Sequence, residues 1–102
     1  MTARYLVTPS ALRDIDAILE FVLENSGPSR ALHVHRRLYE SFKKIGAHPG
    51  LGHIRDDLAD ESLRVHSVFS YIIVYCSETK PVQIIRVIHG ARDVSNALMD
   101  DA

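Results

Sequence analysis

The first half of the chain carries apolar residues at the spacing of two consecutive helices. A short apolar run at 5–7 predicts a strand, and Thr8 with Pro9 then predicts a helix N-cap and first helical residue. Gly27 marks the end of that helix and Pro28 begins a second one, so the short connection predicts antiparallel neighbours. The apolar stripes comprise Leu12, Ile15, Ile18, Leu19, Val22 and Leu23 in the first helix, and Ala31, Val34, Leu38, Phe42 and Ile45 in the second.

The last third changes to the pattern of β-strands. Residues 63–68 alternate between apolar and polar side chains, and residues 71–75 are apolar on both faces. Residues 82–89 follow a turn and should pair antiparallel with the strand at 71–75. Residues 53–62 predict an acidic loop, Gly90 breaks the last strand, and residues 94–99 predict a short helix. The expected fold is α+β in one domain over residues 1–102. In it, an N-terminal short strand and an antiparallel helical hairpin pack on a twisted antiparallel sheet.

Composition narrows the class of protein. A hydrophobic fraction of 46% and a charged fraction of 25% are typical of a folded globular domain. No apolar run approaches the roughly 20 residues that span a bilayer, and the N-terminal residues lack the apolar segment of a secretory signal. The single cysteine, Cys76, has no intramolecular partner, which favours a reducing cytoplasm. A net charge of −1 argues against strong direct binding to nucleic acid.

Polar side chains on the predicted strands are the candidate functional groups. Arg86 lies among apolar residues, so it needs either an ion pair with a carboxylate from the helices or acidic loop, or a contact with a partner or phosphate. Arg64 and His66 share one face of their strand, and His89 ends the last strand. Either histidine fits a general acid–base role or a hydrogen-bonded place in the sheet. Asp93 is expected to cap the terminal helix, and the role of Arg92 stays open.

Metal and cofactor sites are not predicted. His33 and His35 are two residues apart on a helix and so point to different faces. The chain has no HExxH or CxxC pattern, and its glycines at 50 and 52 lack the lysine of a phosphate-binding loop. No G-x-S-x-G elbow supports a serine triad. We therefore expect neither a metal nor a cofactor.

The chain resembles the ParE/RelE superfamily of toxins from type II toxin–antitoxin modules over nearly its whole length. The resemblance rests on short motifs in a fixed order: Leu6-Val7-Thr8-Pro9 with Asp14-Ile15, Pro49-Gly-Leu-Gly52, Leu63-Arg-Val-His66, Tyr71-Ile-Ile-Val-Tyr75 and Ile85-Arg-Val-Ile-His-Gly-Ala-Arg-Asp93. Within this superfamily, RelE-like members cleave messenger RNA on the ribosome, whereas ParE-like members inhibit DNA gyrase.

Two positions favour the ParE-like branch. Ile72 stands where the RelE pattern has an arginine, and Leu98 where it has a tyrosine. Neither side chain can exchange a proton or stabilise a phosphate. A ribosome-dependent endoribonuclease remains the alternative, because other ribonucleolytic relatives use histidine. A second alternative is an inactive toxin fold that only binds its antitoxin.

The resemblance thus implies a gyrase inhibitor without turnover of its own, neutralised by a cognate antitoxin in a hetero-oligomer. The antitoxin would place an amphipathic helix against the hairpin and an extended segment near the sheet. A solvated helix face is the alternative for the basic residues of the second helix. The candidate functional surface is Arg64, His66, Arg86, His89 and Arg92, and the candidate antitoxin-binding residues are Arg30, Arg36, Arg37, Lys43 and Lys44.

Overall fold

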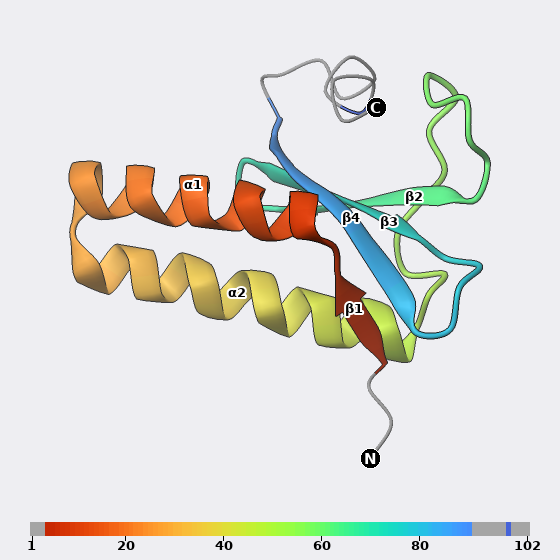
Figure 1. Ribbon diagram of the computed structural model, residues 1–102, viewed down its shortest axis with the longest axis horizontal. Helices are drawn as coiled ribbons and strands as arrows, with labels where there is room; N and C mark the ends of the chain where they lie inside the picture. The colour runs from red at the N-terminus through yellow and green to blue at the C-terminus, as the bar shows by residue number, and fades with distance from the viewer. Residues whose placement is uncertain (1–3, 91–97, 99–102) are drawn as a thin grey trace.

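Two helices and four strands, in the predicted β-α-α-β-β-β order, make up the computed structural model, which describes residues 4–90 and 98 (Figure 1). The predicted helix at 94–99 and the cap at Asp93 therefore lie outside the described residues, apart from Leu98. The elements are β1 (Tyr5–Val7), α1 (Pro9–Ser26), α2 (Pro28–Ala47), β2 (Leu63–Val68), β3 (Tyr71–Cys76) and β4 (Val82–His89).

The two helices form an antiparallel hairpin whose ends are set by local chemistry. The Thr8 side chain accepts a hydrogen bond from the Ala11 N–H at 3.2 Å and so caps α1. Gly27 ends α1 with φ 87°, a conformation that glycine adopts at little cost, and α2 begins at the next residue. Figure 1 shows the helices side by side along the same face of the sheet. The predicted hairpin is confirmed.

The sheet has the strand order β1-β4-β3-β2. Strands β2, β3 and β4 pair antiparallel, as predicted. Strand β1 pairs parallel with β4, with Tyr5 opposite Val82 and Val7 opposite Ile84, which makes the sheet mixed. A register shift lies between Val74 and Tyr75, where β4 carries one extra residue and the side-chain alternation changes.

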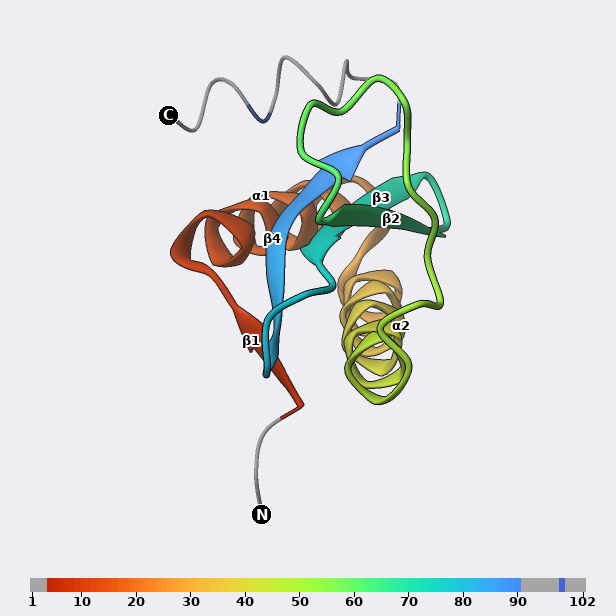
Figure 2. The ribbon, with the colours of Figure 1, turned by 90° about the vertical axis from the view of Figure 1, so that its right-hand side faces the viewer.

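Each face of the sheet carries its own apolar cluster. On the helix side, Ile15, Leu38 and Phe42 pack against residues of β3 and β4. On the other side, Leu58 from the 53–62 loop packs on Val65 and Val74. Figure 2 shows that loop running from the end of α2 to the side of β2 and β3 away from α2. The loop therefore closes the second face.

The predicted apolar stripe of α1 is partly wrong. Leu12 and Leu23 are 44% and 49% exposed, while Ala11 is fully buried. The buried positions Ala11, Ile15 and Val22 lie four and seven residues apart on one face. Each of the two leucines directly follows a buried residue, so both lie to the same side of that face. The stripe of α2 is confirmed, since Val34, Leu38, Phe42 and Ile45 are buried and Ala31 packs against the same cluster.

Candidate functional site

The residues proposed for one functional surface are divided by the sheet. Arg64 and His66 lie on β2, whereas Arg86 and His89 lie on β4, and β3 separates the two strands. Because neighbouring strands are about 4.8 Å apart, the two pairs are separated by roughly 10 Å of sheet. Arg92 lies outside the described residues. The residues predicted to form one functional surface therefore lie in separate parts of the sheet, with different neighbours.

Arg86 is part of the internal structure and not of an open surface. Its Nε and Nη2 donate to the Asp14 carboxylate of α1 at 2.6 and 3.0 Å, and the residue is 8% exposed. The same carboxylate accepts the Val87 N–H at 3.0 Å, at the part of β4 that extends past β1. The predicted ion pair with a helix carboxylate is confirmed, and burial removes Arg86 from the candidate surface.

His89 is the last residue of β4, three residues after Arg86, and lies beside α1. Its ring packs edge-on against Tyr71, with ring centroids 5.7 Å apart. The two rings border a cavity of about 320 Å³ whose other walls come from α1 and β4. An apolar cavity with aromatic walls suits an apolar side chain of a partner better than it suits acid–base chemistry. Its remaining lining residues are Asp14, Ala17, Ile18, Phe21 and Val87.

Arg64 and His66 lie near the C-terminal end of α2, in the α2-end basic group (Lys44, His53, Arg64 and His66). Arg64 Nη1 donates to the Gly52 carbonyl at 3.1 Å. His53 pairs with Val65 through two backbone hydrogen bonds, which holds the loop against β2. Partial burial lowers the pKa of His66, and the charge of Lys44 and the nearness of His53 lower it further. His66 is thus a neutral base beside cations at neutral pH.

The five basic residues proposed to bind the antitoxin are all exposed on α2, and two of them share an aromatic partner. The guanidinium carbons of Arg30 and Arg37 lie 5.0 and 5.3 Å from the centre of the Phe69 ring. Arg37 also lies 3.9 Å from a Glu40 carboxylate oxygen. The sequence analysis did not identify Phe69 as a candidate. The available signal was an aromatic residue between two predicted strands, in a turn that contains no glycine.

The two positions at which the sequence departs from the RelE pattern are apolar in their contacts as well as in their chemistry. Ile72 and Leu98 both pack against the second cluster, formed by Leu58, Val65, Val74 and Ile88. Leu98 thus helps to cover the sheet. A group that took up or released a proton at either place would be partly buried against hydrocarbon.

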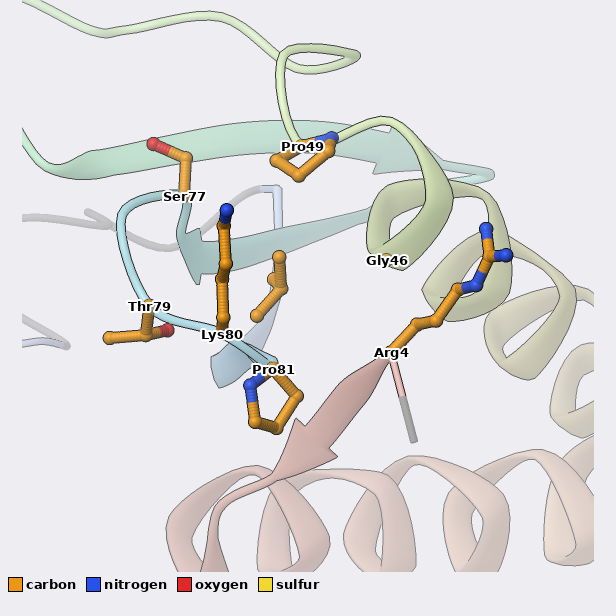
Figure 3. A pocket seen from close by; sticks show the side chains of 8 residues that line it. Arg4, Gly46, Pro49, Ser77, Thr79, Lys80 and Pro81 are labelled. Carbon is orange, nitrogen blue, oxygen red and sulfur yellow. The ribbon is translucent and has the colours of Figure 1, made fainter. Parts of the chain in front are cut away.

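A further cavity of about 410 Å³ lies between the start of β1, the end of α2 and the β3–β4 turn (Figure 3). Arg4 and Lys80 border it, and two proline rings form part of its walls. Gly46 is required here because a Cβ on it would lie 2.8 Å from the Arg4 carbonyl oxygen. Among the described residues that line this cavity there is no carboxylate or histidine, so they supply two basic side chains but no acid–base pair.

Within residues 4–90 and 98, no three His, Cys, Asp or Glu side chains come together as a metal site. Neither described helix is long and apolar enough to cross a bilayer.

Known proteins match both the sequence and the fold. The family model described as "ParE toxin of type II toxin-antitoxin system, parDE" matches residues 5–94. Toxin ParE3 of Caulobacter vibrioides is 30% identical over 95 residues, which is 93% of this chain and 94% of that protein. A solved structure described as the chromosomal ParDE TA system from P. aeruginosa covers 83% of this chain and 92% of its own, with a TM-score of 0.71. Its sequence identity of 22% supports the shared fold alone. The chain therefore belongs to the ParE toxin family of type II toxin–antitoxin systems.

Proposed function

We propose that this toxin inhibits DNA gyrase by binding it, without turnover of its own, and that an antitoxin encoded beside it neutralises the toxin in the cytoplasm. Membership of the ParE family supports both partners. The observation that carries the proposal is the apolar packing of Ile72 and Leu98 at the positions where RelE-like ribonucleases use arginine and tyrosine. Binding a large target requires neither group.

The purified toxin tests this proposal directly. Added to gyrase, ATP and relaxed plasmid, it should inhibit supercoiling and leave DNA cleaved after protein is removed. Antitoxin added in equimolar amount should restore supercoiling. Unchanged supercoiling at a large molar excess of toxin over gyrase would count against gyrase as the target.

A ribosome-dependent endoribonuclease is the second candidate, and the α2-end basic group favours it. RNA cleavage needs a base for the 2′-hydroxyl and cations for the phosphate. His66 supplies a neutral base, and Lys44 and Arg64 lie on neighbouring elements. If this is the activity, translating ribosomes treated with toxin will yield cut messenger RNA, and His66→Ala will abolish the cuts.

The absence of any activity is the third outcome to be distinguished. A toxin fold that only binds its antitoxin would leave cells unharmed when it is expressed alone. Gyrase inhibition predicts filamentation and a DNA-damage response in the same experiment, whereas ribonuclease activity predicts arrest of translation. The three readings therefore separate in one growth assay.

A further inference from the structure

Phe69 occupies a turn position where the backbone disfavours a phenylalanine. Val68 and Tyr71 pair across the β2–β3 hairpin, which leaves Phe69 and Ser70 as a two-residue turn. Phe69 has φ 55°, the left-handed region that such turns usually fill with glycine, asparagine or aspartate. Its side chain is 44% exposed, so burial in the core does not account for the choice of residue. Strained positions of this kind cluster at active sites, ligand clamps and switch regions.

The ring of Phe69 holds two arginines of α2 in place. Arg30 and Arg37 lie over it in cation–π contact, and the His33 ring lies 5.6 Å from it. Positions 30, 33 and 37 are three and four residues apart, so all three side chains leave α2 on one face. We call Phe69, Arg30, His33 and Arg37 the Phe69 platform.

The two guanidinium groups keep donors for an acidic ligand. A cation–π contact does not pair the guanidinium N–H groups with an oxygen acceptor, so they stay available for carboxylates. Within residues 4–90 and 98, no carboxylate lies within ion-pair distance of Arg30. The nearest carboxylate oxygen to Arg37 is 3.9 Å away, beyond hydrogen-bond length. The platform thus presents two pre-oriented cations.

The charge of α2 specifies the class of partner. The helix carries five lysines and arginines against one glutamate, whereas the whole chain has a net charge of −1. Arginine beside an exposed aromatic ring is the composition of protein-binding hot spots. A nucleic-acid base would have to compete with two guanidinium groups for the Phe69 ring, which disfavours that ligand.

We propose that the Phe69 platform binds an acidic segment of the antitoxin, with the aromatic ring holding the two arginines against its carboxylates. This inference rests on the antitoxin partner named under the proposed function, but not on gyrase as the target. The family description supplies the partner, and the platform supplies the place on α2 and the hairpin tip where its acidic residues lie.

Binding of the purified toxin variants to the antitoxin tests the inference by calorimetry. Phe69→Ala and the pair Arg30→Gln/Arg37→Gln should each weaken the affinity about tenfold or more, as expected for a hot spot. The pair Arg13→Gln/Lys80→Gln is the matched control, because it removes the same charge from exposed positions outside α2. It should weaken binding about threefold or less. Phe69→Gly removes the ring while easing the backbone, so its weakened binding cannot be ascribed to unfolding.

The outcomes separate this inference from the proposed function. Wild-type affinity in both platform variants would overturn it. Platform variants that lose gyrase inhibition but keep their antitoxin affinity would assign the platform to gyrase, and this would also overturn the inference. So would variants whose only loss is binding to a labelled single-stranded oligonucleotide. Conversely, a wild-type toxin that leaves gyrase unaffected, with platform variants that bind antitoxin weakly, would refute the gyrase proposal and support the platform.

Discussion

The ion pair between Asp14 and Arg86 should stabilise the toxin by more than an ordinary pair because both partners are enclosed. Their side chains are 14% and 10% exposed, and the shortest contact is 2.6 Å. Asp14→Asn removes the negative charge but keeps an oxygen for the Val87 N–H, so it isolates the loss of the charge. Leaving a buried arginine without its anion costs about 3–5 kcal/mol.

A cycle of variants turns this magnitude into a test. Asp14→Asn and Arg86→Met should each destabilise the toxin strongly, whereas the double variant should lie within about 1 kcal/mol of wild type because no unpaired charge remains. The control is Asp57→Asn, which breaks an exposed pair with Arg55 and should cost at most about 1 kcal/mol. Urea unfolding followed by circular dichroism measures all four.

Thermal unfolding gives a second reading of the same quantity. A loss of 3 kcal/mol corresponds to a fall in Tm of at least about 12 °C for a domain of about 100 residues. Single variants that cost less than about 1 kcal/mol, or costs that simply add in the double variant, would show that Asp14 and Arg86 are not coupled across the helix–sheet contact.

Three further changes test other parts of the structure. Gly46→Ala should destabilise the toxin because its Cβ would meet the Arg4 carbonyl oxygen at 2.8 Å, whereas Gly50→Ala, which meets nothing within 4 Å, should not; urea unfolding compares them. Tyr75→Phe should cost about 1–3 kcal/mol in the same assay, since its fully buried hydroxyl accepts one backbone hydrogen bond and donates another. Burial lowers the pKa of His66, so the unfolded chain binds its proton more readily. Stability should therefore fall as the pH drops through about 6.5, and His66→Gln should flatten that dependence in unfolding measured from pH 8 to 5.

Local signals in the sequence were enough to predict the two helices and four strands of the described residues. Thr8, Pro9 and Gly27 act through their own backbone and nearest neighbours, so their roles are visible without the fold. Leu12 and Leu23 were misplaced because their spacing fits a helical stripe, but the width of the buried face depends on what packs against it.

Contacts between distant segments were harder to predict. The apolar residues around Arg86 predicted either an ion pair with a carboxylate or a contact with a partner or phosphate. Only the position of α1 beside β4 identifies Asp14, which is 72 residues away. The parallel pairing of β1 is likewise set by how the chain returns after the hairpin, and its three residues carry no sign of direction.

The candidate sites likewise combine features that are visible in the sequence with contacts that only the fold creates. His66 was identified from its type and strand position, whereas its neighbours Lys44 and His53 come from a helix end and a loop. Phe69 was missed because positive φ is a property of the folded turn, and no glycine marks it. Its arginines were predicted to bind the antitoxin on charge alone, without the ring that holds them.

The measurement that tests the account most directly compares two activities of one toxin preparation. The apolar packing of Ile72 and Leu98 predicts that the toxin blocks supercoiling by gyrase and leaves messenger RNA intact on translating ribosomes. Antitoxin should reverse the block. Intact supercoiling together with cut messenger RNA, abolished by His66→Ala, would contradict it and assign the activity to the α2-end basic group.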